Sequence, residues 1–392
     1  MTNSPERPIS SSVRLISAEY LPREFKDLQE LSESSSERNP FFEPFFLEPL
    51  LELDTLAAST SFLLISHPER GLVGLVPFSK KHAIRGLFLP HVEVLSHRHC
   101  FYRSPLIRDG FGDFVCSELL AWLGGQRFCL CFLFSRVDLN SQFVRSLLKT
   151  SKRFHRAVHF LDIFERATTS QLLPFDRYLK EGLNKKQSKE ARRKLRRLQE
   201  VGKISVETLT PESDLGQWCS EFLEIERSGW KGATGSALGD QVHEERFFRS
   251  VCERALAEER LVMTRLRVDG KTIALRCGFI ANRILFSFKT AYNEEYSYCS
   301  PGYLLELFAL EELSRDQRIS SIDSCTDPNS QLFERIYNER KMVGTVCISN
   351  GPILGNTSVA VLRLGHLLRQ HLPGSQKEPR ISNFITRLVS LN

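Results

Sequence analysis

Three consecutive segments in the second half of the chain constrain the fold most. Residues 260–268, 272–280 and 283–291 are rich in β-branched and aromatic side chains, and tight turns at Asp269-Gly270 and Ala281-Asn282 separate them. We therefore expect an antiparallel meander. The meander is preceded by a strand at 203–209 and by helices at 211–225 and 241–258. It is followed by a helix from 302, a strand at 318–323, a short helix at 331–337 and a last strand at 343–348.

The first half of the chain follows the same theme with less regular patterns. Early helical segments lead into a hairpin over 61–78, a strand at 85–90, and then alternating helices and strands up to residue 163. We expect an α/β (α+β) protein of two similar domains at 12–165 and 175–350, each a mixed, mostly antiparallel sheet flanked by helices. A tail at 351–392 with a short helix would follow them.

Composition excludes several classes of protein and of site. The chain of 392 residues is 41% hydrophobic and 26% charged, which is typical of globular domains and not of disordered, collagenous or coiled-coil chains. Its longest apolar run, 128–134, is far shorter than the roughly 20 residues that span a bilayer. The first residues lack an apolar signal-peptide core, so we expect a cytoplasmic protein without a membrane span. Ten cysteines without a CxxC pair fit a reducing compartment, and neither they nor the histidines suggest a metal.

The positive charge of the chain is concentrated in one segment. The net charge is +6, and residues 180–203 hold ten Lys or Arg and three Glu, a net of +7. The spacing predicts a helix with cations over much of its surface. A solvated helix is one interpretation; a platform for an anionic acceptor, a coenzyme phosphate or tRNA is the other. Aromatic residues do not alternate with the cations, so we expect no general binding of nucleic acid.

The junction between the strand 283–291 and the next helix is the first candidate binding site. Ser300 is placed to cap the helix, Pro301 suits its first turn, and Gly302 lets a ligand approach the backbone. The free N–H groups of such a helix end, reaching Tyr303, suit a pyrophosphate. Ordinary helix-start chemistry without a ligand explains the same residues equally well.

Four segments together resemble the GNAT superfamily of acetyltransferases. They are NKKQSKEARRKLRRLQE (184–200), SGWKGATGSAL (228–238), FSFKTAYNEEYSYCSPGYLLELFALEE (286–312) and SSIDSCTDP (320–328). More narrowly, they resemble the CelD-like acetyltransferases of cellulose and exopolysaccharide loci, which are tandem GNAT proteins akin to the FemAB peptidoglycan ligases. The resemblance covers roughly 178–348, and the first half matches only in outline. It implies two tandem GNAT-like domains, the first degenerate and shaping the acceptor site.

The resemblance also implies where an acyl-coenzyme A would bind. It would lie in a V-shaped opening between the strands 283–291 and 318–323, with its pyrophosphate at Ser300 to Tyr303. A strand N–H near Phe288 or Lys289 would polarise the acyl carbonyl. An amine of a sugar, amino acid or polysaccharide precursor would then attack directly, without an acyl-enzyme.

Candidate residues for the chemistry lie around this opening. Asp323 at the end of its strand is a candidate general base, although Asp there is also a common turn residue. Lys289 is placed to bind an anionic group or to extend into solvent. Tyr298 and Tyr292 belong to a cluster of four tyrosines, one of which would protonate the leaving thiolate while the others pack around the loop.

Three further residues are candidates for substrate binding. Trp230 and Lys231 lie in a glycine-rich loop, where the indole would stack on a ring of the substrate or close a helix pair. Arg276, in mid-strand among apolar neighbours, needs an anionic partner if it is buried.

The sequence leaves the identity of the acyl donor open. The segment before Gly302 lacks the glycine-rich phosphate loop usual in the superfamily, and FemAB relatives take aminoacyl-tRNA. An aminoacyl-tRNA-dependent transferase and a catalytically silent scaffold in exopolysaccharide assembly are the alternatives to an acyl-coenzyme A enzyme.

Overall fold

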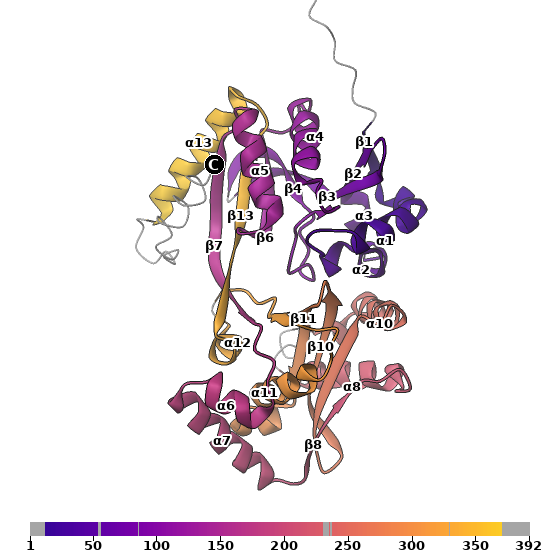
Figure 1. The fold of residues 1–392 in the computed structure, drawn as a ribbon, viewed down its shortest axis with the longest axis vertical. Helices are drawn as coiled ribbons and strands as arrows, with labels where there is room; N and C mark the ends of the chain where they lie inside the picture. Colours follow the sequence, from indigo (N-terminus) through magenta and orange to yellow (C-terminus); the bar gives the residue numbers. More distant parts are fainter. Residues whose placement is uncertain are drawn as a thin grey trace, which may run out of the picture. The chain divides into compact units, whose positions relative to one another are not determined.

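The structure is a computed structural model that describes residues 12–53, 56–84, 86–229, 235, 237–328 and 330–370 (Figure 1). The chain divides into two compact units. The first comprises Met1–Pro44, Thr55–Phe164 and Met342–Asn392, and the second comprises Phe45–Asp54 and Glu165–Lys341. No helix in the described part of the chain is both long and apolar enough to cross a membrane.

The first unit is a mixed sheet with helices against it. Its strands are β1 (Val13–Ser17), β2 (Thr60–His67), β3 (Gly71–Ile84), β4 (Leu87–Val94), β5 (Leu106–Ile107), β6 (Cys131–Asp138), most of β7 (Val158–Thr169) and most of β13 (Glu339–Ser349). Its helices are α1 (Phe25–Glu33), α3 (Leu56–Ser59), α4 (Gly112–Gly124), α5 (Gln142–Arg153) and α13 (Leu354–Gln370), with 3-10 turns η1 (Ala18–Glu24) and η2 (Pro40–Phe42). The strand order is β1-β2-β3-β4-β6-β13-β7, and β4 and β6 form a parallel pair.

The second unit repeats this arrangement. Its strands are β8 (Ile204–Thr208), β9 (Leu261–Val268), β10 (Lys271–Ala281), β11 (Ile284–Tyr292) and β12 (Ser321–Asp323). Its helices are α2 (Pro44–Leu51), α6 (Phe175–Glu181), α7 (Lys185–Gln199), α8 (Leu215–Ser228), α10 (Val242–Ala257), α11 (Pro301–Ser314) and α12 (Gln331–Ile336), with η3 (Leu238–Asp240) and η4 (Glu294–Cys299). The order is β8-β9-β10-β11-β12, followed by the end of β7, and β11 and β12 are the parallel pair. The expected fold class is confirmed: each unit is a mixed, mostly antiparallel sheet flanked by helices.

The turns of the meander form close to the expected positions. Asp269 and Gly270 both have positive φ, as a two-residue hairpin turn between strands requires. The second turn lies one residue later than expected, at Asn282 and Arg283, which also have positive φ. Asparagine tolerates this conformation because its side chain is short and polar, whereas Ala281 stays in the strand.

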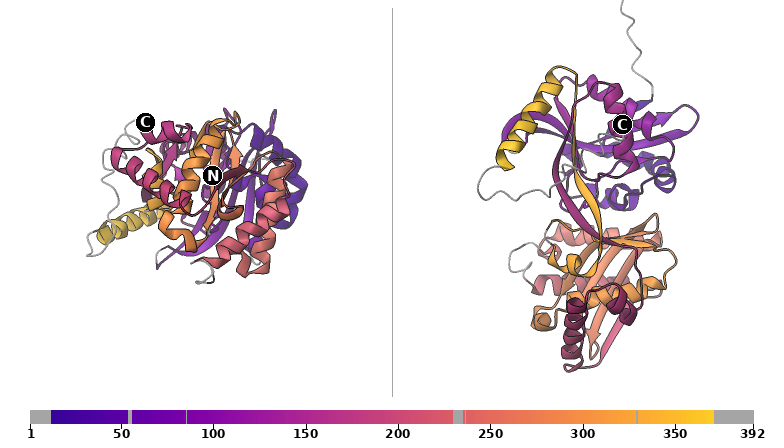
Figure 2. Two further views of the ribbon diagram at one scale, coloured as in Figure 1. Left: turned by 90° about the horizontal axis from the view of Figure 1, so that it is seen from below. Right: turned by 60° about the vertical axis from the view of Figure 1, so that its left-hand side comes forward.

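Two segments join a unit other than the one expected from chain order. The last strand, expected to complete the second domain, pairs with β6 as β13, so the chain returns to the first unit at Met342 (Figures 1 and 2). The segment Phe45–Asp54 belongs to the second unit, because Phe46 packs edge-on against Phe247, Phe279 and Phe288. Both corrections reflect packing between residues distant in the sequence, which local patterns do not encode.

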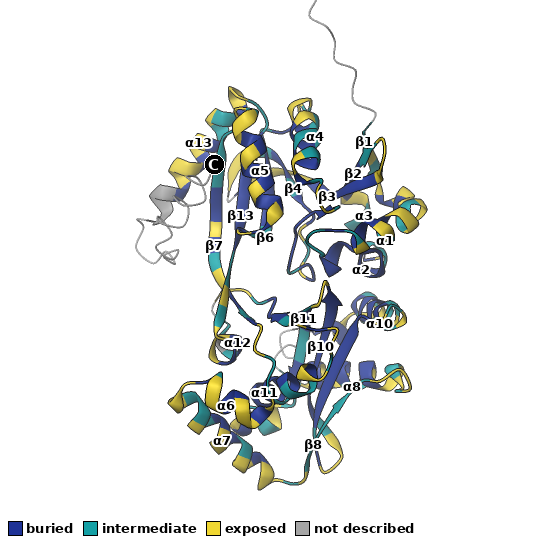
Figure 3. Cartoon of the chain, in the orientation of Figure 1, coloured by how far each residue is buried: buried dark blue, intermediate teal, exposed yellow. Residues whose placement is uncertain are grey.

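Helix α11 occupies the centre of the second unit's core. Ten of its residues are buried on all sides of the helix, which Figure 3 shows in dark blue. A helix that is apolar all round has to be covered on several faces. The sheet covers one face, and α6, α7 and α12 pack on others. This placement holds the start of α11 beside the end of β11.

Candidate functional site

Strands β11 and β12 separate after a short parallel pairing. Their register runs from Ile284–Ser321 to Phe286–Asp323 and stops there, while β11 continues to Tyr292. On its other edge β11 stays paired with β10 over nearly its whole length. The backbone of β11 after Phe286 therefore has no partner in β12, and this is the opening expected from the resemblance.

A β-bulge at Phe288 lies within this unpaired stretch. Cys277 pairs with Lys289 and Gly278 pairs with Ser287, so Phe288 is the extra residue on β11. A bulge leaves its extra residue outside the ladder and turns the local backbone. The bulge lies at one of the two residues whose N–H was expected to act on an acyl carbonyl.

Gly278 makes the bulge possible, and our sequence reasoning missed it. A β-carbon at this position would lie 2.8 Å from the carbonyl oxygen of Phe286 and 3.0 Å from Cδ1 of Leu285. Only glycine permits so close an approach of neighbouring backbone. The signal was present in the sequence, because a glycine within a strand marks a bulge or a close backbone approach.

An aromatic cluster holds the Phe288 side chain. Phe288 is 5% exposed, and its ring centroid lies 5.0 Å from that of Phe279, 5.8 Å from that of Phe46 and 6.4 Å from that of Phe247. These rings come from β10, α2 and α10. The side chain of the bulge residue is therefore packed in the core. Lys289 is half-buried, and its Nζ lies 5.3 Å from the centre of the Phe288 ring.

The start of α11 differs from an ordinary capped helix. Ser300 adopts the left-handed conformation (φ +52°), and its side chain does not cap the helix, contrary to expectation. A capping side chain requires extended backbone at that position, which Ser300 lacks. Its carbonyl oxygen instead accepts the N–H groups of Tyr303 and Leu304. Pro301 takes the first position, as expected.

These bonds leave few amide groups for a ligand. Pro301 has no N–H, and the amides of Tyr303 and Leu304 are already bonded. Within the described part of the chain the Gly302 amide has no acceptor, so among the first amides of α11 it is the one without a hydrogen bond, and the residue is buried. A β-carbon on Gly302 would meet only Cδ1 of Tyr292, at 3.5 Å.

The tyrosines near this junction have different environments. Tyr298 lies on η4 and is 55% exposed, whereas Tyr303 is buried and burial raises its pKa to about 12. The Nζ atom of Lys194 lies 4.6 Å from the centre of the Tyr303 ring. Tyr292 is half-buried and lines a hollow of about 30 Å³ with Glu226 and Thr290. That volume holds about one water molecule.

Asp323 lies where the two strands separate, as the central carboxylate of an ion-pair group. Lys341 Nζ donates to it at 3.1 Å, Arg166 lies 3.7 Å away, and the Cys325 N–H donates to Oδ1 at 2.8 Å. Burial alone raises the pKa of Asp323, but Lys341 and Arg166 outweigh burial and hold the pKa below its ordinary value. A carboxylate with a lowered pKa is a weak proton acceptor.

Arg276 finds its anionic partner inside the unit. Its guanidinium lies 3.2 Å from Glu306 of α11 and 3.3 Å from the Ser287 hydroxyl, and both charged side chains are at most 1% exposed. Burial raises the pKa of Glu306, while Arg276 and the hydroxyls of Tyr337 and Thr290 act in the opposite direction. The structure thus pairs Arg276 with a carboxylate of the same unit.

The remaining expected residues are placed as follows. Trp230 and Lys231 lie outside the described residues. Seven of the expected residues lie in the second half of β11 or at the start of α11. They are Phe288, Lys289, Tyr292, Ser300, Pro301, Gly302 and Tyr303. Among the described residues no group of three or more His, Cys, Asp or Glu side chains is arranged to hold a metal ion.

Comparison with protein families identifies the type of domain to which this region belongs. Residues 185–330 match the family described as an acetyltransferase (GNAT) domain. The chain carries a GNAT acetyltransferase domain. The match covers α7 to β12, the elements that form the opening, the bulge and the start of α11, and the resemblance to the GNAT superfamily is confirmed.

Solved structures extend the likeness to both units of this GNAT protein. FemX shares 10% identity, with a TM-score of 0.54 over 86% of this chain and 98% of its own. A conserved protein of unknown function from Bacteroides thetaiotaomicron shares 12%, with a TM-score of 0.52 over 86% and 98%. The C-terminal domain of a putative lysylphosphatidylglycerol synthetase from Agrobacterium fabrum shares 12%, with a TM-score of 0.50 over 91% and 99%. At these identities the likeness concerns the fold. No match was found among curated protein sequences.

Proposed function

We propose that the second unit transfers an acyl group from acyl-coenzyme A to a primary amine. The bulge at Phe288 carries this proposal, because it takes Phe288 out of the regular ladder where β11 and β12 separate and turns the local backbone there. An N–H held in place there stabilises negative charge developing on a carbonyl oxygen, at no cost of reorganisation during the reaction. The CelD-like resemblance favours a sugar, amino acid or polysaccharide precursor as the acceptor, in exopolysaccharide biosynthesis.

The chain's own residues supply positioning more than acid–base chemistry. In the transfer, the amine nitrogen forms a bond to the acyl carbon and gives up a proton, the carbon–sulfur bond breaks, and the thiolate takes up a proton. Tyr298 is the exposed tyrosine on η4 and the candidate proton donor for the thiolate. Asp323 was the candidate base, but its lowered pKa and two cationic partners favour a role in holding the separating strands. Proximity accounts for much of the acceleration in such transfers.

The Gly302 amide is the proposed contact for the coenzyme's pyrophosphate. It lies at the positive end of α11, and it has no acceptor within the described residues. Lys289 is the proposed contact for an anionic group of the substrate. The role of the first unit in shaping the acceptor site, and those of Trp230 and Lys231 in substrate binding, stay predictions.

Calorimetric titration with acetyl-coenzyme A and a longer acyl-coenzyme A tests the donor. Wild type should bind at least one of them, and Gly302→Glu should abolish binding by placing a carboxylate at the amide. Gly302→Ala is the matched control, because its β-carbon has room beside Tyr292 and the amide is kept. Thermal unfolding of each variant confirms that it folds. Absence of binding to either donor by wild type would refute the proposal.

One observation favours a tRNA-dependent alternative. Within the described residues the start of α11 has one amide without an acceptor, that of Gly302, while α7 is strongly basic. A transferase that takes aminoacyl-tRNA would bind tRNA with a steep salt dependence, since phosphate contacts release counterions. A protein that binds neither tRNA nor coenzyme would fit the scaffold alternative.

A further inference from the structure

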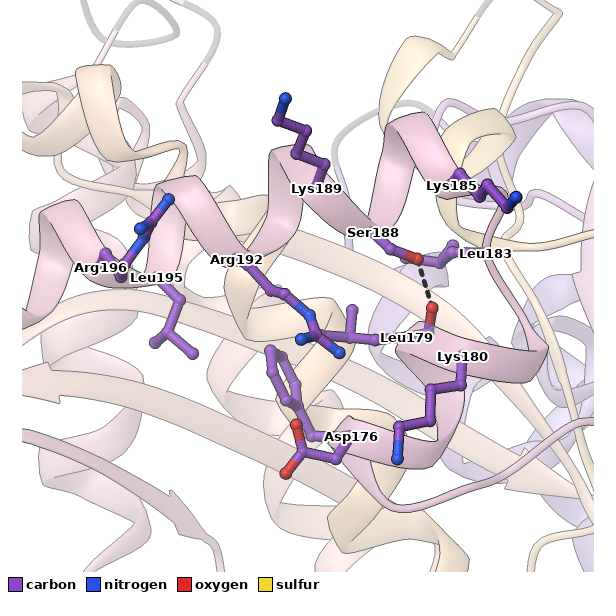
Figure 4. A pocket seen from close by; sticks show the side chains of 11 residues that line it. Asp176, Leu179, Lys180, Leu183, Lys185, Ser188, Lys189, Arg192, Leu195 and Arg196 are labelled. Carbon is purple, nitrogen blue, oxygen red and sulfur yellow. Dashed lines mark hydrogen bonds between the residues drawn. The ribbon is translucent and has the colours of Figure 1, made fainter.

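A basic groove lies between helices α6 and α7 of the second unit (Figure 4). Its volume is about 710 Å³, and it shares no residue with the opening between β11 and β12. Its floor is apolar, and its rim is cationic. The floor consists of Phe175, Leu179, Leu183 and Leu195, and the cations are Lys180, Lys185, Lys189, Arg192 and Arg196.

Hydrogen bonds at the turn between α6 and α7 fix how the two helices meet. Asn184 caps α7 and forms a capping box with Gln187, which sets the turn after α6. The Ser188 hydroxyl donates to the carbonyl oxygen of Leu179, the bond drawn in Figure 4. The opposite side of α7 buries Ala191 and Leu198 in the core. The groove is therefore a built feature of the helix pair and not a gap between loose segments.

Several arginines of the second unit pair with carboxylates, whereas the groove cations do not within the described residues. Arg177, Arg249, Arg265, Arg315 and Arg318 of the same unit each pair with a carboxylate. Within the described part of the chain, none of the five groove cations does so. Arg192 extends across the groove towards α6, whereas Lys185 and Lys189 point outwards along the rim (Figure 4). Asp176 is the one acidic residue that lines it.

We propose that this groove binds anionic phospholipid at a membrane surface. The cations would hold the phosphate headgroups, and the leucine floor would receive the first methylene groups of a chain. Clusters of Lys and Arg bind anionic membrane surfaces, each residue adding to the affinity. A fully polar polyanion would engage the rim alone and leave the apolar floor unused. The proposal concerns a surface outside the acyl-transfer site and does not depend on the proposed function.

Vesicle binding by the full-length protein tests the groove. The probes are phosphatidylcholine vesicles and vesicles with about one third phosphatidylglycerol, compared by co-sedimentation. The double variant Arg192→Glu with Arg196→Glu reverses two groove charges, and Lys186→Glu with Arg193→Glu reverses two exposed α7 charges outside the groove. We expect the groove pair to lose binding to the anionic vesicles about tenfold or more, and the control pair to lose distinctly less.

Two further comparisons separate a lipid from other anions. Short-chain phosphatidylglycerol should bind more tightly than glycerol phosphate, and Leu195→Gln should remove that advantage while leaving glycerol phosphate binding unchanged. Circular dichroism confirms the helical content of each variant.

Several results would overturn the proposal. The first is that wild type binds neither kind of vesicle, or binds both equally. The second is that the two charge-reversal pairs lose equal amounts of binding to anionic vesicles. The third is that wild type has equal affinity for short-chain phosphatidylglycerol and for glycerol phosphate. Another is a groove pair that loses binding to tRNA but not to anionic vesicles, which would assign the groove to nucleic acid.

Discussion

Gly278 on β10 lies so close to the carbonyl oxygen of Phe286 on β11 that a β-carbon there would come within 2.8 Å of it. Gly278 also pairs with Ser287 at the edge of the bulge. The shape of the proposed carbonyl-binding backbone thus depends on a glycine in the neighbouring strand.

We expect Gly278→Ala to damage both stability and transfer. The backbone has to move to admit the methyl group, which costs about 1–3 kcal/mol of unfolding free energy, and the bulge moves with it. Urea unfolding and steady-state acyl transfer measure the two effects. Gly365→Ala in α13 is the control, because nothing lies within 4 Å of that β-carbon; it should be neutral or slightly stabilising. A Gly278→Ala variant with wild-type stability would contradict the prediction.

Breaking the buried Arg276–Glu306 pair should be costly. Glu306→Ala leaves a guanidinium buried without its carboxylate, and loss of one partner of such a pair costs about 3–5 kcal/mol. Joint replacement, Arg276→Met with Glu306→Leu, should recover much of that loss, because no uncompensated charge remains. Denaturant unfolding of the single and double variants tests this. A double variant no more stable than Glu306→Ala would show that the pair does more than neutralise charge.

Asp323 should make folding sensitive to acid. Its folded pKa lies below the unfolded value of about 3.9, so its stabilising effect is present above that value and is lost as the pH falls through the folded pKa. Asp323→Asn should therefore be less stable than wild type near neutral pH, and the difference should shrink below about pH 4. Unfolding free energies across this range provide the measurement. A difference that stays constant with pH would argue against the ion pairs as its source.

Acyl-transfer profiles of the same variant separate positioning from proton transfer. If Asp323 holds the strands, Asp323→Asn should lower the rate at every pH without removing a titration step. Loss of the acidic limb of the pH–rate profile, where the rate falls as the base is protonated, would restore the carboxylate as the base.

Ser300→Gly should stabilise the start of α11. Ser300 adopts φ +52° without a side-chain capping bond, and glycine reaches this conformation without the steric cost that a β-carbon pays, roughly 1 kcal/mol. The greater freedom of glycine in the unfolded chain offsets part of the gain. Thermal unfolding measures the net effect. A clear loss of thermal stability would contradict the prediction, because it would mean that the serine hydroxyl stabilises the folded protein.

Much of the second unit was predictable because its signals are local. The meander 260–291, its Asp269-Gly270 turn, the basic helix and the helix start at Pro301 each depend on residues within a few positions of one another. Side-chain periodicity, turn propensity and the fixed φ of proline act over that range. The GNAT resemblance rested on the order of these elements, and the family comparison confirms it.

Tertiary structure decided what depends on distant partners. The last strand pairs with β6, roughly 200 residues earlier in the chain, and Phe46 joins Phe279 and Phe288 of the second unit. Arg276 pairs with Glu306 of α11, and Asp323 lies between two cations that lower its pKa. The sequence by itself determined the elements and their order, because these follow from neighbouring residues. Only the packing of distant segments decided which charges are neutralised and which amides lack a partner. Burial and pairing are properties of the folded chain, so neighbouring residues alone do not determine them.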